Sequence, residues 1–204
     1  MKTRSRARKN LELHPFRKLV SHNVDAKTFK KFLKEAHNGA VYSAKHLEKA
    51  ELPESAKVAT QLPQIKEGER KILILDLDET LIHTVEKQEN CQVTITDANG
   101  SNIRMNIRPY AVEFLRNMSV HYQIFVFTAS TKGYAEPILL HLDPESTLIS
   151  GLLCRPSCVL TEQGCYVKDL RLFQEQNLSN VVIVDNYVHS FGLQMENGIP
   201  IVPF

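Results

Sequence analysis

The sequence predicts an α/β fold built around a parallel sheet. Three short apolar runs, at residues 71–77, 122–130 and 180–186, have the length and composition of strands that are buried on both faces. Segments with helical spacing separate these runs along the chain. Buried strands that alternate with helices indicate a parallel sheet covered by helices. With 204 residues, 43% of them hydrophobic, the chain can hold one medium-sized domain and an extension.

The first third of the chain is predicted to lie outside that domain. Residues 1–24 are too polar to pack and are expected to form a basic, disordered tail. Residues 25–69 are predicted to form a helical extension and a linker: apolar side chains recur at helical spacing, and Asp25 is placed to cap the helix. The prolines and weak periodicity that follow are typical of a linker. The domain is therefore expected at residues 70–204.

Within the domain, local patterns predict the remaining elements. Residues 93–107 and 157–167 alternate like pairs of strands around Asn-Gly and Gln-Gly, so both are predicted to be small β-hairpin insertions. Further elements are expected as helices at residues 110–118 and 134–142 and as a fourth strand within residues 199–203.

The charge of the chain is unevenly distributed. Residues 1–70 carry 16 Lys and Arg against 8 Asp and Glu, whereas the remaining residues carry 9 against 15. The basic tail is expected either to be solvated with no dedicated partner or to contact an anionic partner, such as nucleic acid, an anionic membrane or an import receptor. No direct nucleic-acid binding is expected of the acidic domain itself.

The sequence indicates neither a membrane protein nor a disulfide-stabilised fold. No apolar run reaches the roughly 18–20 residues of a transmembrane helix, and the N-terminus lacks the apolar stretch of a secretory signal. The four cysteines form no CxxC pair and have no histidines at zinc-ligand spacing. We therefore expect a soluble protein with reduced thiols.

Polar side chains follow each of the three buried strands. They are Asp76 and Asp78 after the first, Thr128 after the second, and Asp185 with Asn186 after the third. Ligands of open α/β sheets bind beyond the carboxyl ends of the strands, so these side chains are expected to meet at one edge. If the first strand continues through Asp78, the two aspartates lie roughly 6–7 Å apart and repel each other by about 2–3 kcal/mol.

An acidic cluster of this kind needs a cation. A small number of oxygen ligands favours Mg²⁺, which retains waters and commonly works beside a phosphate. Lys168 and Thr128 would supply positive charge and donors to that phosphate, so the residues indicate phosphoryl transfer. Asp76 is assigned as the nucleophile that forms an aspartyl-phosphate intermediate. Asp78 is assigned as the group that protonates the leaving alcohol and then deprotonates water, while Ser130 is interpreted as a helix cap.

Several motifs resemble those of a known family. Residues 76–81, DLDETL, resemble the DxDx(T/V) signature of the haloacid dehalogenase (HAD) superfamily, in the form found in the FCP/SCP phosphatases. Further matches are RPxxxEFL at 108–115, FTAS at 127–130, YVKDL at 166–170, VDN at 184–186 and NGIPI at 197–201. The resemblance covers residues 70–204 in order and spacing, and it points to the branch of CTD small phosphatase-like and NLI-interacting-factor-like domains.

The resemblance implies both a fold and an activity. The fold would be a Rossmann-like parallel sheet with helices on both faces. The activity would be that of a Mg²⁺-dependent protein serine/threonine phosphatase, acting on phosphoproteins such as the C-terminal domain of RNA polymerase II. As a soluble protein without a secretory signal, the chain is expected in the nucleus or the cytoplasm.

The resemblance also implies roles for individual residues. Mg²⁺ would be held by Asp76, the backbone carbonyl of Asp78, and the pair Asp185 and Asn186. The transferring phosphoryl group would be bound by Thr128 and Lys168. Arg155 would either contact the substrate or be an ordinary surface arginine.

The sequence departs from the family pattern in a few places. Tyr187-Val188 replaces the usual Ser-Pro, and Cys154 stands where the family often has an aromatic residue. The sequence stops at Phe204, where the family usually continues through a tryptophan-containing loop and a last helix, so the C-terminus is expected to be truncated.

Three other functions stay open. A phosphatase-like module could bind phosphopeptides without turnover. A mitochondrial import component would explain the acid-poor composition of residues 1–24, which carry seven Lys and Arg and one Glu, and would place the protein in mitochondria. A small-metabolite phosphatase is the third alternative, although the small hairpin insertions leave the site open enough for a peptide.

Overall fold

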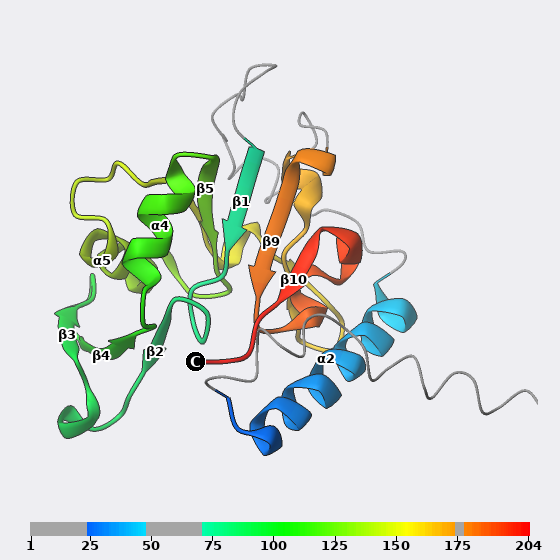
Figure 1. Ribbon diagram of the computed structural model, residues 1–204, viewed down its shortest axis with the longest axis horizontal. Coiled ribbons are helices and arrows are strands. Elements are labelled where there is room, and N and C mark those ends of the chain that lie inside the picture. Colours follow the sequence, from blue (N-terminus) through cyan, green and yellow to red (C-terminus); the bar gives the residue numbers. More distant parts are fainter. Residues whose placement is uncertain (1–23, 48–70, 174–177) are drawn as a thin grey trace, which may run out of the picture. The chain divides into compact units, whose positions relative to one another are not determined.

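The computed structural model describes residues 24–47, 71–173 and 178–204 (Figure 1). The predicted tail, except for residue 24, and the predicted linker after residue 47 lie outside the described residues. The predicted domain limits of 1–24, 25–69 and 70–204 therefore stay predictions. Contacts group residues 35–204 into one compact unit.

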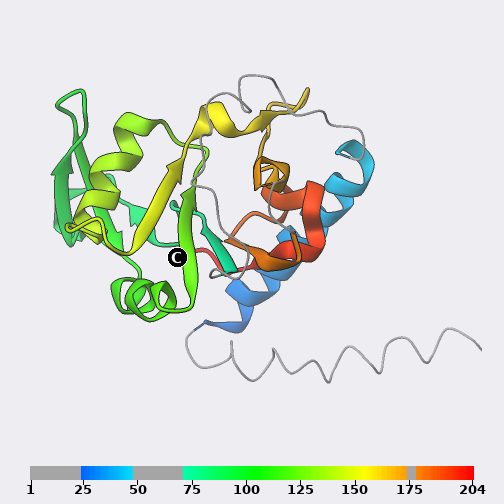
Figure 2. The same cartoon turned by 90° about the horizontal axis from the view of Figure 1, so that it is seen from above.

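A five-stranded parallel sheet forms the core of this unit, with the strand order β10-β9-β1-β5-β6. Its strands are β1 (Lys71–Leu75), β5 (Tyr122–Phe127), β6 (Ile149–Leu153), β9 (Val181–Asp185) and β10 (Gly198–Pro200). Figure 1 shows the labelled strands β10, β9, β1 and β5 side by side, and Figure 2 shows the sheet from above. The predicted parallel sheet is confirmed, and β6 is an additional edge strand that the sequence does not predict.

Side chains alternate between the two faces of the sheet along each strand, and other elements cover both faces. On one face, a core cluster joins the strands to α4 (Ala111–Ser119) and α5 (Lys132–Leu142). On the other face, a second cluster joins them to the 3₁₀ segments η4 (Leu170–Phe173) and η6 (Val188–Asn197), and to the second half of α2 (Ala26–His46). The expected layered α/β architecture is thus confirmed.

Two small antiparallel sheets form the insertions. One contains β2 (Ile82–Thr84), β4 (Asn102–Ile107) and β3 (Val93–Thr96), and the other contains β7 (Val159–Leu160) and β8 (Tyr166–Val167). Both predicted hairpins are therefore confirmed, and β2 adds an unpredicted third strand to the first. Gly100 and Gly164 occupy the two turns with φ of 83° and 81°, a region that side chains rarely adopt.

The helices begin close to their predicted starts. Asp25 caps α2, because its Oδ1 accepts the amides of Lys27 at 2.9 Å and Thr28 at 3.0 Å. α4 and α5 begin one residue after and two residues before the predicted positions 110 and 134. The remaining short 3₁₀ segments are η2 (Gln88–Asn90), η3 (Arg155–Ser157) and η5 (Leu178–Asn180).

Candidate active site

The polar residues that follow the buried strands meet at one edge of the main sheet. β1 lies between β5 and β9 and runs parallel to both, so the carboxyl ends of the three strands are neighbours. The amide of Asp76 donates to the Val184 carbonyl at 3.0 Å, which fixes Asp76 beside the end of β9. The amide of Thr128 donates to the Leu153 carbonyl at 2.9 Å, which fixes the end of β5 in the same way.

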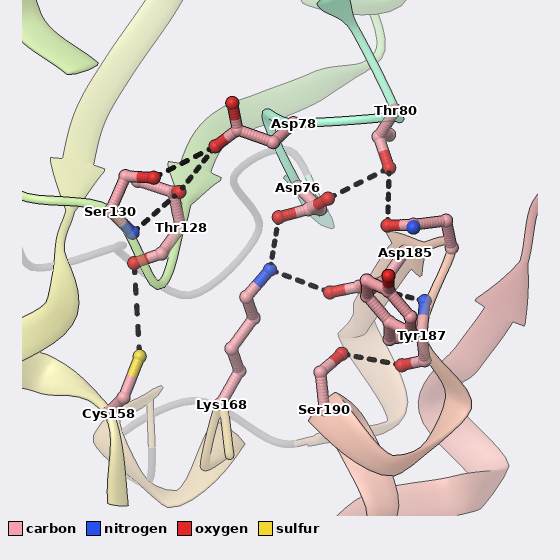
Figure 3. A network of polar contacts seen from close by, with 11 residues as sticks. Asp76, Asp78, Thr80, Thr128, Ser130, Cys158, Lys168, Asp185, Tyr187 and Ser190 are labelled. Atoms are coloured by element: carbon pink, nitrogen blue, oxygen red, sulfur yellow. Dashed lines mark hydrogen bonds and ion pairs between the residues drawn. The ribbon is translucent and has the colours of Figure 1, made fainter. Parts of the chain in front are cut away.

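Lys168 bridges two of the predicted carboxylates (Figure 3). Its Nζ donates to Oδ1 of Asp76 at 2.5 Å and to Oδ2 of Asp185 at 2.6 Å. The three side chains are 3%, 9% and 1% exposed for Lys168, Asp76 and Asp185, respectively. We call these residues the ion triad. Its members come from three separate segments, since Asp76 follows β1, Asp185 ends β9 and Lys168 follows β8.

Burial and mutual charge interactions shift the pKa values of Asp76 and Lys168. Burial raises the pKa of Asp76 to about 7; the Lys168 ammonium opposes this shift and the Asp185 carboxylate adds to it. Burial alone would lower the pKa of Lys168, but the two carboxylates outweigh it and hold the pKa above its ordinary value. Lys168 therefore stays charged and compensates the buried carboxylates.

The other oxygens of the two carboxylates also have partners. Thr80 Oγ1 donates to Oδ2 of Asp76 at 2.9 Å, and the Tyr187 amide donates to Oδ1 of Asp185 at 2.7 Å. Asn186 lies in the same cluster, with its Oδ1 3.5 Å from Thr80 Oγ1. Its Nδ2 is buried and has no hydrogen-bond partner among the described residues. A buried polar atom without a partner indicates that another group completes the site.

Asp78 belongs to a separate set of contacts. β1 ends at Leu75, and the chain then turns at Leu77, whose carbonyl accepts the amide of Leu81 at 2.8 Å. The first strand therefore does not continue through Asp78. The distance predicted between Asp76 and Asp78, as residues on the same side of one strand, does not apply. The turn instead directs Asp78 toward the loop that follows β5 (Figure 3).

Side chains from the β5–α5 loop and from α5 hold the Asp78 carboxylate. Ser130 Oγ donates to its Oδ2 at 2.9 Å, the Tyr134 hydroxyl donates to its Oδ1 at 2.5 Å, and Thr128 Oγ1 lies 3.5 Å from Oδ2. Burial raises the pKa of Tyr134, and the Asp78 carboxylate raises it further, so the phenol stays protonated and donates. We call Ser130 and Tyr134 the Asp78 clamp.

Arg155 lies beside the loop that carries Thr128. Its Nε donates to the Ala129 carbonyl at 2.7 Å, and its guanidinium lies 5.2 Å from the centre of the Tyr166 ring. The residue is exposed. These two contacts fix an exposed positive charge beside the loop that carries Thr128.

Three contacting residues are not predicted from the sequence. Thr80 carries a local signal, because it lies within the DLDETL motif in the turn after Asp76. Ser130 is interpreted as a helix cap, whereas its hydroxyl donates to Asp78 and the α5 cap position is Thr131. Tyr134 has no local signal, since it meets Asp78 across 56 positions of sequence.

The site offers oxygen ligands suited to a divalent cation. Among the described residues, no three His, Cys, Asp or Glu side chains gather as a metal site, so an ion here would combine carboxylates with amide or carbonyl oxygens and water. Asp76 and Asp185 supply the carboxylates. The Asn186 amide, whose nitrogen is buried without a partner, can turn to present its oxygen. Mg²⁺ suits this set because it retains several waters, so the residues fit the ion.

Comparisons with known proteins place the chain in a family. The profile described as "NLI interacting factor-like phosphatase" matches residues 71–204. The chain is 39% identical over 145 residues to CTD small phosphatase-like protein 2 of Dictyostelium discoideum, covering 69% of this chain and 25% of that protein. It is 36% identical over 146 residues to the Homo sapiens Carboxy-terminal domain RNA polymerase II polypeptide A small phosphatase 2, covering 69% and 53%. The chain thus spans between a quarter and about half of the length of these relatives.

The fold is similar to a solved structure of the fission yeast RNA polymerase II CTD phosphatase Fcp1 bound to beryllium fluoride. The TM-score is 0.54 at 24% identity, over 66% of this chain and 42% of that chain. In the part of the chain that the structure describes, no helix has the length and apolarity to cross a membrane. The family match includes every residue of the candidate site and confirms the resemblance carried by the motifs: the chain belongs to the NLI interacting factor-like phosphatases, the FCP/SCP-type branch of the HAD fold.

Proposed function

We propose that this chain is a Mg²⁺-dependent phosphoprotein phosphatase that works through an aspartyl-phosphate intermediate on Asp76. The ion triad carries this proposal. Both oxygens of Asp76 are held by donors, from Lys168 and Thr80, so the carboxylate is oriented before a substrate binds. The Lys168 ammonium has three N–H groups and uses two of them on carboxylates. One N–H remains for an oxygen of the phosphoryl group.

The first step transfers the phosphoryl group to the protein. A carboxylate oxygen of Asp76 attacks phosphorus, and the bond between phosphorus and the ester oxygen breaks. Asp78 enters this step protonated and gives its proton to the departing alcohol oxygen. Ser130 and Tyr134 donate to the carboxylate that forms as the proton leaves. Thr128 and Lys168 bind phosphoryl oxygens throughout.

The second step regenerates the protein. A water molecule attacks phosphorus, its proton passes to Asp78, and the bond between phosphorus and the Asp76 oxygen breaks. Inorganic phosphate leaves, with Asp76 again a carboxylate and Asp78 again protonated. Two displacements with a positioned acid and base replace one difficult hydrolysis.

Mg²⁺ would be held by the carboxylates of Asp76 and Asp185, the Asn186 amide oxygen and the backbone carbonyl of Asp78. When bound, it supplies positive charge that offsets the repulsion between the Asp76 carboxylate and the phosphate. The buried Nδ2 of Asn186, which has no hydrogen-bond partner in the part of the chain that the structure describes, supports this assignment.

The proposed substrate is a phosphoserine or phosphothreonine in a protein, such as the C-terminal domain of RNA polymerase II. The name of the Homo sapiens relative, Carboxy-terminal domain RNA polymerase II polypeptide A small phosphatase 2, refers to that substrate. Among the described residues, the insertions are a small three-stranded and a small two-stranded sheet, which supports a site open to an extended peptide. Arg155 would contact that peptide. We also propose that the protein works in the nucleus or the cytoplasm and that its basic tail contacts an anionic partner.

Hydrolysis of para-nitrophenyl phosphate and of a phosphoserine peptide tests the proposal. Turnover should require Mg²⁺, stop with EDTA and be lost in Asp76→Asn. Asp143→Asn is the matched control, because Asp143 is a buried carboxylate that accepts the amides of Thr147, Leu148 and Ile149 before β6, at the opposite edge of the sheet. Absence of turnover in folded protein with Mg²⁺ would contradict the proposal, and phosphopeptide binding under those conditions would indicate a non-catalytic module.

A further inference from the structure

Residues 35–47, which are the second half of α2 and the following Leu47, pack closely on η6. A Cβ added to Gly39 would lie 3.0 Å from the Cβ of Val188. A Cβ added to Gly192 would lie 2.0 Å from Oγ of Ser43, which is only 4% exposed. At Gly192 a side chain would force the two segments apart, and at Gly39 it would make a contact tighter than most real Cβ contacts, so the two glycines allow this close approach.

The same half of α2 also contacts the β7–β8 hairpin. The Tyr42 hydroxyl lies 3.0 Å from Thr161 Oγ1 and 3.0 Å from Gln163 Oε1. Leu47 is 1% exposed and packs in one cluster with Val159 and Val167. One short stretch of helix therefore contacts two segments that are distant in sequence.

Both of these segments lead directly into the ion triad. Lys168 follows Val167 at the end of the hairpin, and its backbone amide donates to the Ser190 carbonyl of η6 at 2.5 Å. Asp185 ends β9, shortly before η6 begins at Val188. Lys168 and Asp185 thus sit on two chain segments that are joined to each other and that both pack against residues 35–47.

We propose that residues 35–47 position Lys168 and Asp185 relative to each other, so that this segment is part of the catalytic unit. The inference rests on the proposed phosphatase function. The family match begins at residue 71, so it assigns nothing to this segment. Without the helix, the hairpin and η6 keep the Lys168–Ser190 backbone hydrogen bond and the Lys168–Asp185 ion pair but lose the packing that both make with residues 35–47. A displacement of about 1 Å at an active site can lower turnover about 100-fold.

If residues 35–47 detach from η6 and the hairpin, the main sheet keeps its hydrophobic core. An open surface pocket of about 440 Å³ borders the contact and is lined by Leu47, Gly192 and Leu193, among others. In the core cluster of this face, α2 contributes only the partly buried residues Ala36 and Ala40. A variant that opens the contact is therefore expected to loosen the loops around the triad while the sheet stays folded.

Gly39→Leu in the full chain opens the contact. Leucine has a much higher helix propensity than glycine, so a loss of function would come from the lost docking and not from a weaker helix. Asn38→Leu is the matched control, because Asn38 is the exposed neighbour on the same helix. Tyr42→Phe is a milder second variant, which removes only the hydroxyl that reaches the hairpin.

Hydrogen exchange and kinetics are the two measurements. Exchange is followed in peptides that cover residues 166–170 and 186–192, without substrate. kcat and KM for para-nitrophenyl phosphate are measured with Mg²⁺ well below the melting temperature. Gly39→Leu is expected to speed exchange in both peptides and to lower kcat roughly 10- to 100-fold with a smaller change in KM. Tyr42→Phe should lower kcat about two- to tenfold, and Asn38→Leu should match the wild type.

Two results overturn the inference. One is unchanged exchange in both peptides of Gly39→Leu, and the other is faster exchange with a wild-type kcat, which would leave the segment a structural role only. If the wild-type protein shows no turnover, the phosphatase proposal fails, and with it any effect on catalysis. The exchange data then still decide whether residues 35–47 brace the two loops.

Discussion

Replacement of Tyr134 by phenylalanine tests whether the clamped Asp78 carboxyl acts as the general acid. The change removes only the hydroxyl that donates to Oδ1 of Asp78 at 2.5 Å and keeps the ring on α5. Ser130 still donates to Oδ2 at 2.9 Å. The carboxyl therefore keeps one short contact but becomes free to rotate about it.

The size of the effect follows from the lost contact. A hydrogen bond to a charged group contributes about 1.5–3 kcal/mol, and about 1.4 kcal/mol corresponds to a tenfold change in rate. We expect kcat/KM for a phosphoserine peptide to fall about 10- to 100-fold, because the serine alkoxide needs a proton to leave. Nitrophenolate leaves without that help, so kcat/KM for para-nitrophenyl phosphate should fall less than about threefold.

The assay compares both substrates in Tyr134→Phe and Ser130→Ala. kcat/KM is the right quantity, because it reports the steps up to the first phosphoryl transfer and is insensitive to the second displacement. Tyr122→Phe is the control, since Tyr122 is a partly buried tyrosine at the start of β5, at the opposite edge of the sheet. An equal loss for both substrates, or no loss for either, refutes the reasoning.

Three further changes probe the site. Lys168→Met should abolish turnover and lower the free energy of unfolding in urea by about 3–5 kcal/mol, because two buried carboxylates lose their cation; wild-type stability would contradict the ion triad. Arg155→Ala should raise KM for the phosphopeptide about two- to fivefold and leave para-nitrophenyl phosphate unaffected; equal effects on both substrates would count against a peptide contact. Burial raises the pKa of Cys158 to about 12, so at pH 8 it stays a thiol and should react with iodoacetamide far more slowly than the half-exposed Cys91. Its rate should rise as pH approaches 12, and mass spectrometry that finds equal rates at pH 8 would contradict its burial.

The central strands are predictable from the sequence because each carries a continuous apolar run that parallel sheets bury on both faces. The edge strand β6 is not, since its sequence ISGLL contains a serine and a glycine. A Cβ added to Gly151 would lie 2.9 Å from the ring of Phe125 on β5. The residue that weakens the strand signal is thus the one that lets β6 pack against its neighbour.

The charged members of the site are predictable for a topological reason, because residues that follow neighbouring parallel strands share one edge of the sheet. The Asp78 clamp is not, since Ser130 and Tyr134 lie 52 and 56 positions from Asp78 and meet it only through the path of the loop into α5. The face of α2 that packs on η6 is not predictable from the sequence for another reason. It depends on small residues such as Gly39 and Ser43, which add nothing to a hydrophobic periodicity.

Charge balance explains why one site uses both a lysine and a divalent cation. Two carboxylates and one ammonium give the ion triad a net charge of −1 when all three are ionised. A phosphate monoester adds about −1.5 to −2, so the buried site with substrate would hold close to −3, and a divalent cation returns it to about −1. Lys168 is therefore needed by the folded protein even without substrate, whereas the cation is needed mainly when phosphate binds. EDTA should accordingly stop turnover and change the free energy of unfolding far less than Lys168→Met does; equal losses of stability would contradict this division of roles.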